Sequence, residues 1–378
     1  MKHTNRKILY FSPVDWAFCI HHLAVARAAR EAGHDVVVVT RVIEHAAPIL
    51  AAGLRLIPLE ISRDGIAPLR ELLTLFQLYK IYRKEHPDLV HHFAIKPMLY
   101  GSIASILAKV PATINGLIGL GFVFTSERTS ARLLRPLVIF AMRIFLNRQN
   151  SRVTFQNSDD LRILTAKRII DPAKARLILG SGVNIEAFTP SAEPEGDVTV
   201  IMPARLLLDK GVNEFVCAAR LLKARGVQAR FALVGDRDIQ NPATVPQSTI
   251  EKWREEGTVE IWGWRTDMAQ VYRECHVVCL PSYREGFPMV LLEAAACGRP
   301  LVSTDVEGCR EAVVHNYSGL LVPARNATAL AEALADLINN PAKRMTFGAN
   351  ARAIVVKEFS IPVVINHTFA VYREVLPT

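Results

Sequence analysis

The sequence predicts an α/β protein made of two domains, each built on a parallel β-sheet with helices on both faces. Short apolar runs rich in β-branched residues alternate with longer helical segments along the chain. A polar, proline-containing stretch at 189–196 interrupts this alternation, which then restarts. At 378 residues the chain is also too long for one compact core. We therefore expect two domains of nearly equal size.

The first half contains six predicted strands and a helix between the first two. The helix is Ile20–Ala32, which Gly33 ends. The strands are short apolar runs that we assign to Lys7–Pro13, Asp35–Thr40, Leu54–Leu59, Asp88–His92, Ala112–Asn115 and Arg152–Gln156. Ligands of such sheets bind at the loops that follow the carboxyl ends of the strands. Residues in those loops are therefore the first candidates for function.

The second half repeats this pattern and ends in a helix. Its predicted strands are Val198–Pro203, Phe231–Gly235, Val259–Gly263 and His276–Leu280. Its predicted helices are Val212–Arg225, Met289–Cys297 and Ile361–Leu376. We find no repeat between the two halves in the sequence itself, so any duplication is structural.

Composition narrows the class of partner and the compartment. The net charge of +9 predicts a negatively charged partner, such as a nucleotide sugar, an anionic lipid or a nucleic acid. Nucleic acid ranks last because the basic stretches lack interleaved surface aromatic residues. The six cysteines form no CxxC pair, which predicts reduced thiols. Without an apolar run of transmembrane length or a signal peptide, the chain is expected in the cytoplasm.

Two stretches of the first half are candidates for membrane contact. Residues 69–84 carry Leu72, Phe76 and Tyr79 at helical spacing and end in basic residues. Residues 132–148 carry four arginines around a hydrophobic body. A basic amphipathic helix can lie in the headgroup layer of an anionic membrane. The alternative for both stretches is a core helix with a solvated basic rim.

The most informative stretch is 276–298, which is predicted to form a strand, a glycine-containing loop and a helix. This layout aims backbone N–H groups and the positive end of a helix dipole at an anion. Glu285 lies on the loop, and Glu293 lies inside an otherwise apolar helix. A buried carboxylate is costly without a partner, and sugar or ribose hydroxyls are suitable partners.

Residues 281–311, PSYREGFPMVLLEAAACGRPLVSTDVEGCRE, resemble the donor-site signature of retaining glycosyltransferases of family 4. Glu285 and Glu293 keep the spacing of the two glutamates in that signature. The resemblance is strong over 198–360 and weaker over 1–190. It implies the GT-B architecture, with a Rossmann-like acceptor domain at 1–188, a Rossmann-like nucleotide-sugar domain at 189–360, and a helix at 361–378 that returns to the first domain.

Arg205 and Lys210 lie between a predicted strand and the helix that begins at Val212, where two cations can grip one diphosphate. The resemblance implies the same role for them, with Gly182 at a hinge near the diphosphate. It also implies that Trp264 and Arg265 lie near the nucleotide base and that Glu293 binds the ribose. The sugar hydroxyls would be positioned by Glu285, Gly286, Phe287 and Pro288.

The first half carries the candidate acceptor side. His91 and His92 end a predicted strand and resemble the histidine-bearing strand end of the family, so both are candidate catalytic residues. Because side chains alternate between faces, at most one of them points toward a cleft. Asn115 and Gly116 follow the next strand, where many relatives have His-Gly. The stretch INGLIGLGFVF resembles a subgroup of bacterial polysaccharide-assembly transferases.

Together these features predict a retaining transferase that moves a hexose or N-acetylhexosamine from a UDP-sugar to a polyprenyl-diphosphate-linked or other glycan acceptor in cell-surface polysaccharide synthesis. No cofactor and no metal are expected, because Arg205 and Lys210 can neutralise the phosphates; Asp236 and Asp238 are only a weak metal signal. The expected location is peripheral, on the inner face of the plasma membrane. A UDP-sugar epimerase, a glycogen- or sucrose-type transferase and a non-catalytic nucleotide-sugar-binding partner are the alternatives.

Overall fold

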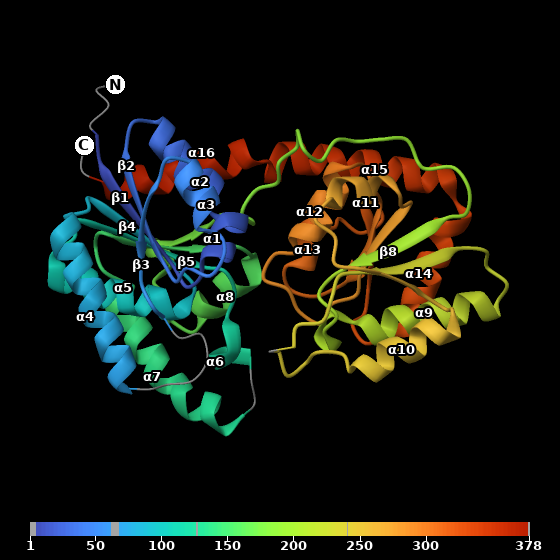
Figure 1. The fold of residues 1–378 in the computed structure, drawn as a ribbon, viewed down its shortest axis with the longest axis horizontal. Helices are drawn as coiled ribbons and strands as arrows, with labels where there is room; N and C mark the ends of the chain where they lie inside the picture. Colours follow the sequence, from blue (N-terminus) through green and yellow to red (C-terminus); the bar gives the residue numbers. More distant parts are fainter. Residues whose placement is uncertain (1–4, 62–67, 126–127, 240, 377–378) are drawn as a thin grey trace. The chain divides into compact units, whose positions relative to one another are not determined.

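The structure, a computed structural model, describes residues 5–61, 68–125, 128–239 and 241–376. The chain forms two compact units, one made of the chain up to Gly182 together with the segment from Ile361, and one made of Val183–Ser360 (Figure 1). The first boundary lies before the predicted position at 188. Val183 pairs with Ser360, and Arg352 donates to the carbonyls of Ile185 and Phe188, which holds this segment in the second unit.

The first unit contains a seven-stranded parallel sheet in the order β3-β2-β1-β4-β5-β6-β7. The strands are β1 Lys7–Ser12, β2 Asp35–Thr40, β3 Arg55–Pro58, β4 Leu89–Phe93, β5 Ala112–Leu117, β6 Ser151–Phe155 and β7 Ala175–Leu177. Alternate side chains of β1 enter separate cores, Ile8 and Tyr10 on one face and Leu9 and Phe11 on the other. This two-sided burial explains why the strands have continuous apolar sequences.

Helices cover both faces of this sheet (Figure 1). They are α1 Asp15–His21, α2 Leu23–Glu31, α3 Ala46–Ala51, α4 Pro68–Glu85, α5 Ile95–Ala108, α6 Gly121–Thr125, α7 Thr129–Phe145, α8 Ser158–Ala166 and α16 Ile361–Val375. The predicted helix at Ile20–Ala32 was wrong in its start. Helix begins at Asp15, breaks at His22 and resumes at Leu23, because the backbone of His22 leaves the helical region at φ −132°.

The second unit contains a six-stranded parallel sheet in the order β10-β9-β8-β11-β12-β13. The strands are β8 Thr199–Pro203, β9 Arg230–Val234, β10 Glu260–Gly263, β11 Val277–Leu280, β12 Leu301–Thr304 and β13 Gly319–Val322. The helices are α9 Val212–Ala224, α10 Gln247–Glu256, α11 Met268–Arg273, α12 Met289–Ala296, α13 Cys309–Ala312, α14 Ala327–Asn339 and α15 Pro341–Ile354. The predicted α/β class with two parallel-sheet domains is confirmed.

None of the helices in the described parts of the chain combines the length and the apolar character needed to cross a membrane.

Candidate functional site

The predicted donor residues of the second unit follow the carboxyl ends of neighbouring strands. Arg205 and Lys210 follow β8, and Glu285 follows β11, which pairs with β8 in the sheet. Trp264 and Arg265 follow β10, which is the edge strand. Because all the strands are parallel, these loops meet at one edge of the sheet. The fold therefore gathers candidate residues that lie far apart in the sequence.

Two glycines bring the loops close together. Gly211, which follows Lys210, has φ +77°, and a Cβ atom there would lie 2.0 Å from the carbonyl oxygen of Pro281. Gly308, which follows β12, has φ +76°, and its Cβ would lie 2.7 Å from the carbonyl oxygen of Gly286. Only glycine allows both the left-handed backbone and the close approach. These contacts fix the loop that carries Glu285 from two sides.

Lys210 and Glu285 form the centre of the site. The Lys210 Nζ lies 2.6 Å from Glu285 Oε1, and the Ser282 hydroxyl donates to the same oxygen at 2.6 Å. The two charged side chains are only 19% and 11% exposed. A charge-assisted pair in such a shielded place is stronger than a surface salt bridge. The predicted phosphate-binding cation and the predicted sugar-binding carboxylate are thus in contact.

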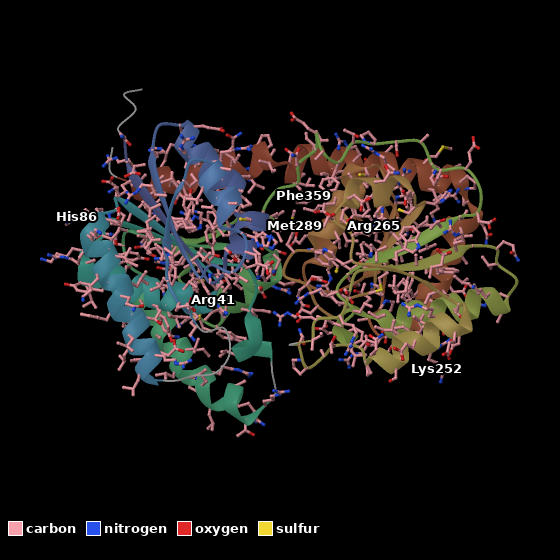
Figure 2. All side chains as sticks on the ribbon, in the orientation of Figure 1. Arg41, His86, Lys252, Arg265, Met289 and Phe359 are labelled. Atoms are coloured by element: carbon pink, nitrogen blue, oxygen red, sulfur yellow. The ribbon has the colours of Figure 1, made fainter. Side chains whose placement is uncertain are left out.

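Arg205 and Arg265 are also paired with carboxylates. Arg205 donates to Asp238, which follows β9, at 2.7 Å, and half of the Arg205 side chain is exposed. Arg265, labelled in Figure 2, donates to both oxygens of Asp267 at 2.7 and 2.6 Å. Trp264 is 68% exposed, which leaves an aromatic ring at the surface beside Arg265. Asp238 therefore serves as the partner of Arg205.

Glu293 lies on the helix that follows the Glu285 loop. This helix, α12, begins at Met289, labelled in Figure 2, directly after Phe287 and Pro288. Burial raises the pKa of the Glu293 carboxyl to about 7, although a hydrogen bond from the Tyr272 hydroxyl at 3.0 Å favours the ionised form. Glu293 therefore changes its charge near neutral pH. Tyr272, on α11, is a neighbour that sequence reasoning missed.

The first unit contains a small cavity at the carboxyl edge of its sheet. Its lining includes His91 on β4, Gly116 on β5, and His22 between α1 and α2. Gly182 directly follows Ser181, a residue that lines this cavity. Its φ is +85°, and a Cβ atom there would lie 2.8 Å from the Cα atom of Ile361. Gly182 therefore belongs to the first unit, whereas the other predicted donor residues belong to the second.

His92 and Asn115 do not line this cavity. His92 is completely buried on the opposite face of β4, where it contacts the Tyr82 hydroxyl and the Asn115 side chain, both at 2.9 Å. Asn115 is also completely buried and donates to Ser151. Both side chains point into the core, because side chains alternate between the faces of a strand. The catalytic role predicted for His92 and the acceptor contact predicted for Asn115 stay predictions.

Three sets of neighbours in the site were not predicted from the sequence. They are Ser282 beside Glu285, Tyr272 beside Glu293, and the cavity residues Thr154, Gln156 and Ser181. Ser282 directly precedes the loop that carries Glu285, so the sequence alone indicated a hydroxyl group near that carboxylate. Tyr272 and the cavity residues come from elements whose packing the sequence pattern does not specify.

Two protein families match the chain. Residues 7–157 match the family described as glycosyl transferase 4-like, and residues 184–354 match the family described as glycosyl transferases group 1. Each match covers most of one of the two structural units.

Curated relatives and solved structures agree with these families. N,N′-diacetylbacillosaminyl-diphospho-undecaprenol α-1,3-N-acetylgalactosaminyltransferase of Campylobacter jejuni is 30% identical over 349 residues, which are 88% of this chain and 90% of the relative. UDP-Gal:α-D-GlcNAc-diphosphoundecaprenol α-1,3-galactosyltransferase of Escherichia coli is 26% identical, over 79% and 78%. A crystal structure of HepE from Anabaena in complex with UDP superposes with a TM-score of 0.79 at 20% identity, over 97% of this chain and 100% of HepE.

Proposed function

The chain belongs to the glycosyltransferases of group 1 and has the GT-B fold, and we propose that it transfers a hexose or N-acetylhexosamine, with retention of configuration, from a UDP-sugar to a polyprenyl-diphosphate-linked glycan. The observation that carries the proposal is the contact between Lys210 and Glu285 at the edge where β8 and β11 end. A cation and a carboxylate so close together suit the junction between a diphosphate and a sugar.

The proposed chemistry uses charges that the chain itself supplies. As the bond between the anomeric carbon and the phosphate oxygen breaks, Arg205 and Lys210 stabilise the negative charge that grows on the UDP leaving group. The acceptor hydroxyl oxygen forms the new bond on the same face of the sugar, and its proton passes to the departing phosphate oxygen. No metal ion or other cofactor takes part in this scheme.

The remaining donor residues position the substrate. Glu285 and the backbone of Gly286, Phe287 and Pro288 hold the sugar hydroxyls. The positive end of α12, which begins directly after this loop, adds a favourable dipole for the diphosphate. Glu293 accepts hydrogen bonds from the ribose hydroxyls, which add to the one hydrogen bond that it receives from Tyr272. Positioning of this kind accounts for a large part of the rate that glycosyl transfer needs.

The acceptor class rests on the relatives and on a surface of the first unit. The two relatives described above are named for acceptors on diphospho-undecaprenol. Such a lipid stays in the membrane, so the enzyme must reach the membrane surface. We call the exposed apolar residues of α7 the α7 stripe; they are Leu133, Leu137, Phe140 and Ile144.

The α7 stripe has the character of a membrane-contact face. Leu133 is 76% exposed, and the spacing of the four residues places them on one side of the helix. The exposed Arg132 and Arg148 lie at its two ends. On α4, which like α7 packs on α5, Leu69, Leu72 and Phe76 are also exposed, and the Lys80 ammonium lies 4.4 Å from the Phe76 ring centre. Apolar residues with basic neighbours favour an anionic membrane surface as a partner.

The test of the proposed reaction is product analysis. The protein is incubated with single UDP-sugars and a short-chain polyprenyl-diphosphate-linked N-acetylhexosamine, and the new linkage is identified by NMR. The proposal predicts a disaccharide whose new linkage keeps the α configuration of the donor, with release of UDP that depends on the acceptor. A β linkage contradicts retention, and a changed sugar on UDP without any acceptor points to an epimerase instead.

A further inference from the structure

The small cavity beside His91 has the size of one small chemical group. Its volume is about 40 Å³, and its polar lining comes from His21, His22, His91, Thr154, Gln156 and Ser181 among others. We call it the imidazole pocket. A water molecule needs only 10–15 Å³ of such space, so the pocket has room for a hydroxyl or hydroxymethyl group but not for a sugar ring.

Two nitrogen atoms in the wall of the imidazole pocket lack hydrogen-bond partners. Within the described residues, Nε2 of His22 and Nε2 of His91 are buried without any partner. The two side chains are only 6% and 4% exposed. A buried polar atom without a partner is unfavourable, so a ligand that supplies the missing hydrogen bonds is favoured at this place.

The two rings are held in place by their neighbours. The His22 ring stacks on Phe93 with centroids 3.4 Å apart, and the His91 ring lies 4.2 Å from the same ring. On its other side, His91 Nδ1 lies 2.8 Å from the Tyr372 hydroxyl, which donates to the Tyr10 hydroxyl at 3.1 Å. Since Tyr372 occupies His91 Nδ1, only His91 Nε2 is left for a further hydrogen bond.

The electrostatics of the pocket favour an uncharged ligand. Burial lowers the pKa of both His22 and His91 well below the usual value, and each also has a neighbouring histidine that lowers it further. Both rings are therefore neutral at pH 7. The residues that line the pocket include no lysine, arginine, aspartate or glutamate. A phosphate group would find no opposite charge there, whereas a hydroxyl finds acceptors and donors.

We propose that the imidazole pocket binds one hydroxyl group of the acceptor sugar through Nε2 of His22 and His91. This inference rests on the proposed function, because it takes a sugar acceptor as given. A hydroxyl donates one hydrogen bond and accepts others, so it can satisfy His91 Nε2 and a second group of the pocket at once. The pocket would then select acceptors that carry a hydroxyl at one ring position, as sites built to bind a hydroxyl do.

The test combines one variant with a set of acceptors. In His22→Phe, an aromatic ring of similar size keeps the stack on Phe93 but lacks Nε2. The acceptors are polyprenyl-diphosphate-linked N-acetylglucosamine and its monodeoxy analogues, each lacking one hydroxyl. For the wild-type protein, kcat/KM should fall ten-fold or more with one analogue. His22→Phe should lose a similar factor with the parent acceptor and no further factor with that analogue.

Two controls distinguish an effect on the imidazole pocket from an effect on the donor site and from a general loss of structure. Tyr82→Phe removes a hydrogen bond to His92 on the opposite face of β4, and it should leave the acceptor preference unchanged. The UDP-induced rise in melting temperature should be the same in His22→Phe as in the wild-type protein. If the losses from His22→Phe and from the deoxy analogue multiply, the pocket holds a structural water only and the proposal is overturned.

A direct binding measurement keeps the proposal testable if no transfer occurs or if the variant does not fold. The ¹⁵N resonances of the His22 and His91 imidazoles are recorded in the wild-type protein while methyl N-acetylglucosaminide is added. Movement of both Nε2 resonances, absent with the matching monodeoxy glycoside, supports the pocket even where the transferase assay fails. Nε2 resonances that do not move with the glycoside at saturating concentration overturn it.

Discussion

At the scale of single residues, the central feature is the ion pair between Lys210 and Glu285. Their atoms lie 2.6 Å apart and are largely shielded from solvent. In the proposed reaction, the diphosphate is a second anionic partner for Lys210 and the sugar hydroxyls are further partners for Glu285, so both residues keep their contact with each other while they bind the donor. The contact holds both charged groups in a fixed orientation, which is the arrangement that electrostatic catalysis requires.

Replacing either member of this pair tests its role. Lys210→Ala and Glu285→Ala should each lower kcat/KM by about ten-fold or more, the scale of a lost transition-state contact. The double variant should lose less than the product of the two factors, because each single variant leaves a shielded charge unpaired. Steady-state kinetics measure these factors. Lys252→Ala, at an exposed lysine of α10 labelled in Figure 2, is the control and should keep wild-type rates.

Glu293 gives the donor site a pH dependence. Its pKa is raised to about 7, so the carboxyl is largely protonated below that pH in the free protein. If the ionised form binds the ribose, the affinity for UDP should fall by up to about ten-fold per pH unit below pH 7. Titration of UDP binding by calorimetry between pH 5.5 and 8.5 measures this slope. A slope of the same steepness in Glu293→Gln would contradict the assignment.

The same group also affects stability. In the unfolded chain the carboxyl titrates near 4.5, whereas in the folded protein it titrates near 7. Between these values the folded state binds more protons, so its contribution to the free energy of unfolding is present below pH 4.5 and is lost as pH rises through 7. In denaturant titrations, Glu293→Gln should therefore gain stability relative to the wild-type protein as the pH rises from 5 to 8. A stability difference that does not change with pH contradicts the shifted pKa.

At the scale of elements, the loops that follow β11 and β12 form one structural piece. Gly308 approaches the carbonyl oxygens of Gly286 and Glu285 at distances that leave no room for a side chain. Gly308→Ala should therefore displace the Glu285 loop and weaken UDP binding by ten-fold or more, as calorimetry would measure. Gly226→Ala is the control that measures the cost of the left-handed backbone without the steric clash. Gly226 has the same φ of +76°, but a Cβ atom there would meet nothing within 4 Å.

Both glycine variants should lose roughly 1–2 kcal/mol of stability from the strained backbone. Only Gly308→Ala should lose donor binding as well. Equal UDP affinity in the two variants would show that the contact between the two loops does not hold the site.

Helix α7 is the element that tests membrane contact. Leu137→Glu and Phe140→Glu place a charge in the α7 stripe without disturbing the core, because both residues are more than 60% exposed. Each should lower binding to anionic vesicles in a sedimentation assay by several-fold, with little change in melting temperature. Met345→Glu, at a similarly exposed residue of α15, is the matched control. Vesicle binding that none of the three changes would place the membrane contact elsewhere.

At the scale of the whole molecule, the sequence pattern predicts the two parallel sheets because their strands are buried on both faces and therefore read as apolar runs. It does not predict which side chains of β4 and β5 face a ligand. His91 and His92 look equivalent in the sequence, yet one lines the imidazole pocket and the other lies in the core. The short strand β7 was also missed, since only three residues carry its pattern.

The carboxyl-terminal helix illustrates a second limit. Its apolar spacing predicts α16 almost to its ends, but not its partners. The structure shows that Val364, Val371 and Tyr372 complete the core of the first unit and that Tyr372 orients His91. Contacts between segments that lie 281 positions apart in the chain depend on tertiary packing, which local patterns do not encode.

The donor site is the central claim, and thermal unfolding with nucleotides tests it most directly. Melting temperatures of the wild-type protein and of Lys210→Ala are measured without ligand, with UDP and with ADP at matched concentrations. Because binding to the folded state raises the melting temperature by mass action, UDP should raise it in the wild-type protein, and Lys210→Ala should lose most of that rise. If UDP produces no rise, or an equal rise in Lys210→Ala, the donor site does not lie at Lys210 and Glu285.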